Sequence, residues 1–184
     1  MIIINYHNIT YPDMNNGDGL RVVLWLSGCS HCCKGCQNSQ TWDVNSGIKF
    51  DDSAKEELFR ELEKDYISGI TLSGGDPLHG YNVREVYLLL REIKNKYPEK
   101  TVWIYTGYKF EEISYRHNPH YDFLNSTQTD DYRDLIINLC DVLIDGKYIE
   151  ELKDLTLKWR GSSNQRVINV QESLKQNKII LHCN

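Results

Sequence analysis

Apolar runs of four to six residues recur along the chain, separated by polar segments. Within each run the side chains do not alternate between apolar and polar, which indicates strands that are buried on both faces. Strands of this kind are typical of parallel sheets. We expect them at residues 21–26, 69–73, 101–106, 141–144, 166–170 and 178–182.

Helical patterns lie between these runs. Leu58 and Leu62 share one face of a helix that residues 52–53 can cap and that runs to about residue 66. Asn82 can cap a second helix, which ends before Pro98, and a weaker third helix spans residues 131–139. Strands that alternate with helices predict right-handed βαβ units and a parallel sheet.

The length of the chain limits the architecture. With 184 residues, it is too short for an eightfold barrel of about 250 residues. We therefore expect one α/β domain over residues 1–184, with five or six mainly parallel strands in a partial (β/α) barrel or an open sheet. The polar residues 114–130 are interpreted as a long surface loop.

Composition and charge narrow the classes of function. The formal net charge of −5 argues against a protein that binds nucleic acid through a general basic surface. No stretch approaches the ~20 apolar residues of a membrane span, and the amino terminus lacks the features of a signal peptide. We therefore expect a cytoplasmic protein, in which six cysteines indicate metal or redox chemistry rather than disulfides.

Four of these cysteines crowd into residues 29–36, directly after the first predicted strand. In a parallel sheet this position is the carboxyl edge, where ligands bind. Three thiolates in one loop can surround a soft metal centre, and three ligands leave one iron of a four-iron cube open to a small molecule. Gly28 and Gly35 suit a loop that wraps tightly around such a centre.

Two registers and a second metal compete for this loop. Cys29, Cys33 and Cys36 have the spacing C-x3-C-x2-C, whereas the use of Cys32 in place of Cys33 gives C-x2-C-x3-C. Adjacent cysteines are not expected both to face one cluster. A structural zinc site that uses all four cysteines or His31 is the alternative metal centre.

A glycine-rich sequence, LSGGDPL, ends the second predicted strand at residues 72–78. Gly74 and Gly75 let the backbone approach a ligand closely, and the Asp76 carboxylate can accept a hydrogen bond from an ammonium group. A plain turn between a strand and a helix is the alternative, since Gly-Gly-Asp-Pro is also a good turn sequence.

Together, the two motifs resemble those of the radical S-adenosylmethionine superfamily. Further segments resemble, more narrowly, the family of proteins that activate anaerobic ribonucleoside-triphosphate reductases. These segments are SGCSHCCKGCQNSQTW at residues 27–42, TGY at 106–108, DVLIDG at 141–146 and WRGSSNQR at 159–166. The first segment departs from the family at Lys34, where proline is frequent, and at Gln37, where tyrosine is frequent.

The resemblance implies a partial barrel of the radical S-adenosylmethionine type and one 4Fe–4S cluster on Cys29, Cys33 and Cys36. It implies an oxidoreductase that cleaves S-adenosylmethionine to a 5′-deoxyadenosyl radical, which generates a glycyl radical on the reductase. A low-potential electron donor such as flavodoxin is implied as a second partner. Expected cofactor-binding residues are Gly35, Gln37 and Asn38 beside the cluster, Gly74, Gly75 and Asp76 at the methionine, and Thr106 and Asp145 at later strand ends.

Two rival functions remain. An activating enzyme for a different glycyl-radical enzyme, such as a formate-lyase, is the nearest, and residues 159–166 argue against it. A metal-binding scaffold without catalytic activity is the rival from another class, and it leaves Gly74 and Gly75 without a role.

Overall fold

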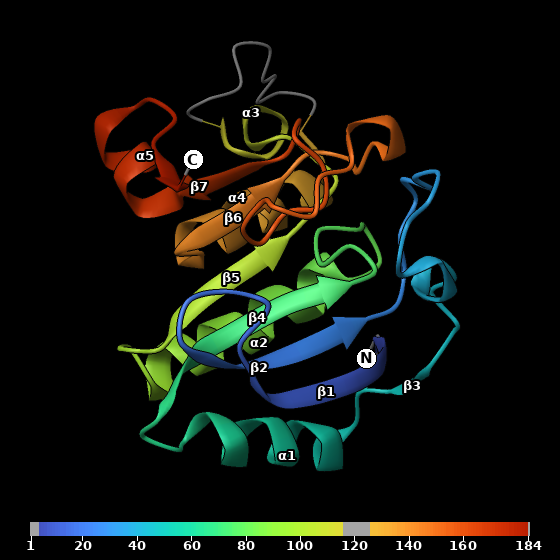
Figure 1. The fold of residues 1–184 in the computed structure, drawn as a ribbon. Helices are drawn as coiled ribbons and strands as arrows, with labels where there is room; N and C mark the ends of the chain where they lie inside the picture. Colours follow the sequence, from blue (N-terminus) through green and yellow to red (C-terminus); the bar gives the residue numbers. More distant parts are fainter. Residues whose placement is uncertain (1–3, 116–125, 184) are drawn as a thin grey trace.

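One eight-stranded sheet runs through the molecule in the computed structural model, which describes residues 4–115 and 126–183. Figure 1 shows its arrangement. The strands stand in the order β3-β1-β2-β4-β5-β6-β7-β8. Their bounds are β1 Asn5–Asp13, β2 Leu20–Leu26, β3 Ile48–Lys49, β4 Ile67–Gly74, β5 Thr101–Tyr105, β6 Val142–Asp145, β7 Arg166–Asn169 and β8 Leu181–Cys183.

The centre of the sheet is parallel and both flanks are antiparallel. Strands β2, β4, β5 and β6 pair in parallel, whereas β1 and β3 on one flank and β7 and β8 on the other pair antiparallel. The α/β class is confirmed and the sheet is mixed. The expected count of five or six mainly parallel strands is wrong, because polar side chains hide β1, β3 is only two residues long, and the last two strands reverse direction.

Four helices lie in the connections between the strands of the parallel centre: α1 (Asp52–Leu62), α2 (Val83–Lys96), α3 (Phe110–Ile113) and α4 (Gln128–Leu139). A fifth, α5 (Val170–Gln176), connects β7 to β8, and there are single 3-10 turns η1 (Ser39–Thr41) and η3 (Glu150–Leu152). No helix among the described residues is long and apolar enough to cross a membrane.

The boundaries of two helices differ from the sequence prediction. Asp51 caps α1 by accepting the Ala54 N–H at 3.0 Å, so the cap stands one residue early, and the helix ends at Leu62 rather than near residue 66. Thr127 caps α4, which therefore begins at Gln128. Residues 128–130 of the expected loop are thus helical, and residues 116–125 of that loop lie outside the described residues.

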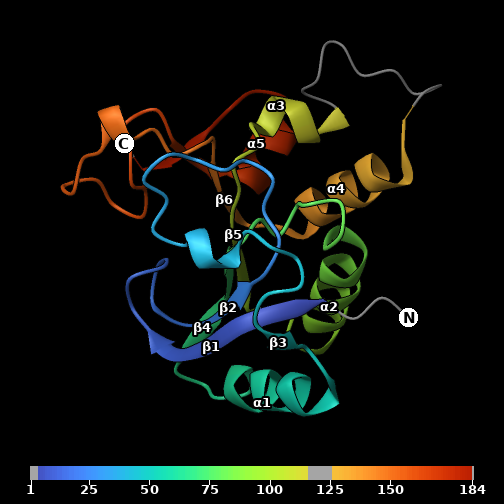
Figure 2. The same cartoon turned by 90° about the vertical axis from the view of Figure 1, so that its right-hand side faces the viewer.

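The helices cover one face of the sheet, where the main core lies. Side chains point to alternate faces along a strand, and Val22, Leu24 and Leu72 on this face pack with Leu58 of α1 and Leu90 of α2. All five are fully buried. Figure 2 shows α2 and α4 to the right of the strands and α1 below β1.

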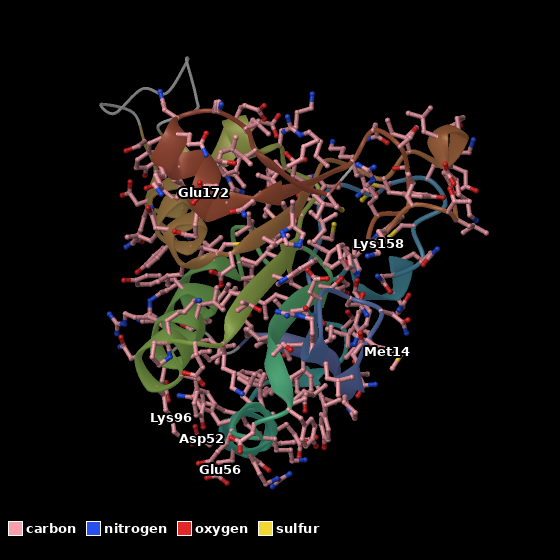
Figure 3. The ribbon with its side chains drawn as sticks, turned by 60° about the vertical axis from the view of Figure 1, so that its left-hand side comes forward. Met14, Asp52, Glu56, Lys96, Lys158 and Glu172 are labelled. Carbon is pink, nitrogen blue, oxygen red and sulfur yellow. The ribbon has the colours of Figure 1, made fainter. Side chains whose placement is uncertain are left out.

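Loops cover the opposite face. Trp103 packs there with Val142, Ile144 and Val167 in a smaller cluster, and Trp159 lies edge-on to it with ring centroids 4.9 Å apart. The covering segments are residues 14–19 between β1 and β2 and residues 150–165 between β6 and β7. Their residues Met14 and Lys158 are labelled on one side of the molecule in Figure 3.

A buried arginine closes this face at the amino ends of the parallel strands. The guanidinium of Arg21 donates to Thr71 Oγ1 at 2.7 Å and to the carbonyls of Ile70 and Thr101 at 2.7 and 2.9 Å, and it lies over the Trp103 ring. Burial lowers the pKa of Arg21 to about 10. The donors of Arg21 therefore join β2, β4 and β5 at this end of the sheet.

Candidate cofactor site at the carboxyl edge of the sheet

The cysteine loop begins where β2 ends, at the carboxyl edge of the sheet. The Gly28 N–H donates to Thr41 O at 2.7 Å and the Cys29 N–H donates to Trp42 O at 3.0 Å, so the far end of the loop folds back beside its start. Gly28 has φ +95° and Gly35 has φ +74°. These left-handed angles favour glycine and give the loop its tight curvature.

The four thiols differ in exposure. Cys29, Cys33 and Cys36 are partly buried, whereas Cys32 is exposed and has φ +47°. Burial raises the pKa of Cys29 to about 11, and Asp76, Cys33 and Cys36 add to the increase through their negative charge. Burial also raises the pKa of Cys33, with a contribution from Cys36. The thiolates of Cys29 and Cys33 therefore need a positive centre to stabilise them.

The donor set suits a multi-iron centre. Soft thiolates select iron–sulfur clusters or zinc, and a coordinated thiol is deprotonated by the metal charge. Within residues 4–115 and 126–183, no three His, Cys, Asp or Glu side chains converge closely enough to share one ion. In a cube each iron takes its own ligand, so three separated thiols on one loop fit it.

The glycine-rich strand end lies directly against the cysteine loop. Leu26 and Gly74 are partners in the parallel β2–β4 pair, and the Asp76 N–H donates to Gly28 O at 2.7 Å. A Cβ atom on Gly75 would stand 2.6 Å from Gly28 O, and Gly74 has φ +93°. The two motifs, almost 40 residues apart in the chain, are therefore in backbone contact at one sheet edge.

Asp76 is the centre of a hydrogen-bond network rather than a free acceptor. Its carboxylate accepts from the Leu78 N–H at 2.8 Å, the Gly107 N–H at 3.0 Å and the Thr106 hydroxyl at 2.9 Å. His31 Nε2 lies 2.7 Å from the same carboxylate, and the Asp76 residue is 2 % exposed. Asp76 and Thr106, both expected at the cofactor, thus contact each other.

The sequence does not indicate the role that two residues have in this network. His31 stands among the cysteines and suggests a metal ligand, but its ring faces Asp76. Asn82 suggests a helix cap, yet its side chain makes no cap hydrogen bond. The buried Asn82 amide instead donates to Ser27 O at 2.8 Å and to Asp76 O at 3.0 Å, so it joins the two motifs.

Two cavities flank the cysteine loop. The smaller, of about 370 Å³, lies on the loop-covered face and is lined by Cys36, Gln37, Asn38, Ser73 and Tyr105 among others. The larger, of about 800 Å³, is lined by residues that include Ser30, His31, Gly107, Asp145 and Lys147. Both volumes suit small-molecule sites. Of the residues expected at the cofactor, Gln37 and Asn38 line the smaller cavity and Asp145 lines the larger one.

Asp145 is held by protein groups at the end of β6. It is 1 % exposed, accepts the Phe110 N–H at 2.8 Å and forms an ion pair with Arg166. Arg166 also pairs with Glu111, and hydrogen bonds to both carboxylates raise the pKa of Arg166. Arg160, from the same sequence segment, lines the smaller cavity and donates to Gln165 O at 2.9 Å.

Comparison with known proteins identifies the family. Residues 15–168 match the family described as 4Fe-4S single cluster domain. Three relatives are named anaerobic ribonucleoside-triphosphate reductase-activating protein. The one from Escherichia coli (strain K12) is 42% identical over 166 residues, which are 89% of this chain and 97% of the relative. The one from Haemophilus influenzae is 38% identical, covering 88% and 96% of the two chains, and the one from Enterobacteria phage T4 is 41% identical, covering 89% and 93%. The chain therefore belongs to the family of anaerobic ribonucleoside-triphosphate reductase-activating proteins.

Proposed function

We propose that this protein is an oxidoreductase that activates an anaerobic ribonucleoside-triphosphate reductase by radical S-adenosylmethionine chemistry. The observation that carries the proposal is the backbone contact between the cysteine loop and the Gly74–Gly75 strand end. A cluster on the loop and a methionine on the strand end would thereby be neighbours. The names of the relatives support the choice of partner.

We propose Cys29, Cys33 and Cys36 as the three ligands of one 4Fe–4S cluster. These thiols are partly buried beside one another, whereas Cys32 faces solvent, which supports the C-x3-C-x2-C register. Three protein ligands leave one iron for the amino and carboxylate groups of S-adenosylmethionine. The open mixed sheet, with its loop-covered face, would serve as the partial barrel that surrounds them.

Different residues would contact different parts of S-adenosylmethionine. The backbone of Gly74 and Gly75 would hold the methionine part, since the absence of side chains exposes its amide and carbonyl groups. Gln37 and Asn38, with Gly35 behind them, would contact the adenosyl part in the smaller cavity. The side chains of Asp76, Thr106 and Asp145 make protein contacts, so they would act mainly by fixing the strand ends around the ligand.

The bound cluster would supply the electron that breaks the sulfur–carbon bond of S-adenosylmethionine, and the resulting 5′-deoxyadenosyl radical would take a hydrogen atom from a glycine of the reductase. The protein supplies position and exclusion of water. A low-potential donor such as flavodoxin would reduce the protein.

The first test uses anaerobic reconstitution with iron and sulfide, followed by dithionite and S-adenosylmethionine. We expect about four irons per chain in brown protein and formation of 5′-deoxyadenosine. Cys36→Ala should abolish the product, whereas Cys183→Ala, a partly buried cysteine on β8, should not. Wild-type protein that binds one zinc, or that forms no more product than Cys36→Ala, would overturn the proposal.

The register and the partner have separate tests. Cys33→Ala should lose the cluster and Cys32→Ala should keep it; the reverse result would assign Cys32 as the ligand. Incubation with the reductase should give a glycyl radical in the electron paramagnetic resonance spectrum. Cleavage of S-adenosylmethionine without that signal would point to another protein substrate, such as a formate-lyase.

A further inference from the structure

We propose that His31 is a positioning residue that clamps the cysteine loop onto the glycine-rich strand end through Asp76. The geometric part of this inference concerns the iron-free protein alone. Its effect on the binding of S-adenosylmethionine rests on the proposed function.

The contact is short, buried and directional. His31 Nε2 lies 2.7 Å from Asp76 Oδ2, and the two side chains are only 8% and 2% exposed. Because an ionised carboxylate only accepts hydrogen bonds, Nε2 must carry the hydrogen. A hydrogen bond of this kind, with a charged acceptor in a buried place, is among the stronger ones in proteins.

The His31 ring sits in a niche that other residues shape around it. The Tyr108 ring stands edge-on to it with centroids 4.6 Å apart. A Cβ atom on Gly107 would stand 2.3 Å from His31 Cδ2, although the Gly107 backbone has no left-handed angle that demands glycine. The Gly107 N–H also donates to Asp76 Oδ2. The His31 ring therefore leaves no room for a side chain at residue 107.

Between its first and last cysteine the loop also contacts Tyr108 through Ser30 and the Tyr148 backbone through Cys33, but neither contact has a charged partner. Its other ion pair, between Lys34 and Glu151, is more than half exposed on both sides and contributes little. The Cys36 N–H bonds within the loop, to Cys33 O. His31 is thus the buried side chain that links the middle of the loop to the sheet, at the carboxylate that also fixes Thr106 and Gly107.

This arrangement makes the two motifs one unit. Loss of the His31 ring would release the loop and leave the buried Asp76 carboxylate short of one donor, so both the loop and the strand end would open more often. The thiols and the Gly74–Gly75 backbone would then no longer be held at a constant separation.

The test measures amide hydrogen exchange in the iron-free full-length protein by mass spectrometry. The variants are His31→Ala, Gly107→Ala and the double variant. The matched control is His182→Ala, because His182 Nε2 also lies 2.7 Å from an aspartate, Asp18, away from the cysteine loop.

We expect His31→Ala to accelerate exchange about tenfold or more in residues 27–36 and 74–79, as the loss of a charged hydrogen bond predicts. Gly107→Ala should have a similar effect by displacing the ring. The double variant should be no faster than the faster single variant, since the collision disappears with the ring. His182→Ala should leave both segments unchanged.

A second measurement uses reconstituted protein. His31→Ala should raise the concentration of S-adenosylmethionine that half-saturates the change in the electron paramagnetic resonance spectrum about tenfold. His31→Gln, which retains an N–H donor, should recover part of that loss. If His31→Ala does not fold, His31→Gln and Gly107→Ala carry the exchange test.

Unchanged exchange in both segments of His31→Ala would overturn the clamp, and so would a Gly107→Ala effect that is equally large with and without the His31 ring. The two proposals fail separately. Wild-type protein that cannot cleave S-adenosylmethionine while the exchange results hold would overturn the proposed function alone. If wild-type protein cleaves S-adenosylmethionine but hydrogen exchange in His31→Ala is unchanged, the clamp alone would be overturned.

Discussion

Gly75 offers the sharpest test of the contact between the two motifs. A Cβ atom at this position would lie 2.6 Å from Gly28 O and 2.9 Å from Gly28 N, both backbone atoms that cannot rotate away. In Gly75→Ala the two backbone segments must part by about 0.8 Å to reach an ordinary contact of 3.4 Å. A similar shift would stretch the Asp76 N–H to Gly28 O hydrogen bond, now 2.7 Å, beyond useful range.

The close contact and the stretched hydrogen bond both lower the free energy of unfolding. Overpacking costs about 1–3 kcal/mol and a lost hydrogen bond about 1 kcal/mol, so we expect a decrease of about 2–4 kcal/mol in the free energy of unfolding. For a chain of this size that corresponds to a fall of roughly 5–15 °C in the melting temperature.

Urea unfolding of the iron-free protein under reducing conditions measures the effect. The matched control is Gly80→Ala, because a Cβ atom there would meet only the Thr129 side chain, at 3.7 Å. We expect Gly80→Ala to unfold like the wild type. If Gly75→Ala were as stable as Gly80→Ala, the close approach of the strand end to the cysteine loop would be refuted.

Three further predictions concern charge, pH and the partner. Arg166→Ala leaves the buried Asp145 without its cation and should lower the free energy of unfolding by about 2–3 kcal/mol, less than for a fully buried pair because Arg166 is partly exposed. Lys34→Ala removes an exposed ion pair and should lower the free energy of unfolding by under about 1 kcal/mol. Equal losses for Arg166→Ala and Lys34→Ala in urea unfolding would contradict this ranking. The pKa of Cys29 is raised to about 11 in the folded iron-free protein, from 9.0, so the folded state keeps a proton that the unfolded state releases between these values. Stability should therefore fall from pH 9 to pH 11, more steeply in wild-type protein than in Cys29→Ser, and identical slopes would argue against a buried thiol. Leu152 is 42% exposed on η3 beside the cysteine loop, where it could contact the reductase. Leu152→Asp should lower glycyl-radical formation on the reductase about tenfold and leave cleavage of S-adenosylmethionine in the absence of the reductase unchanged. An equal loss of both activities would exclude a role of Leu152 in docking the reductase.

Local patterns predicted the central elements well. The apolar runs at residues 21–26, 69–73 and 101–106 correspond to β2, β4 and β5, because strands that are covered on both faces need continuous apolar side chains. The flanks were harder to predict. β1 is largely polar, and the direction of β7 and β8 depends on how the chain returns to the sheet rather than on the residues of the strands themselves.

The sequence by itself determined the candidate groups of this protein: four thiols within residues 29–36 and a glycine-rich strand end, because the identity and spacing of such groups are properties of a short segment. Only the tertiary structure decided how these parts meet. Asp76, whose motif predicts a ligand group, is hydrogen-bonded to His31 and Thr106, and the side chain of Asn82 joins the two motifs instead of capping its helix. Such contacts join residues 30 to 55 positions apart, and their partners are chosen by which strands are neighbours in the sheet, a choice that no local pattern contains.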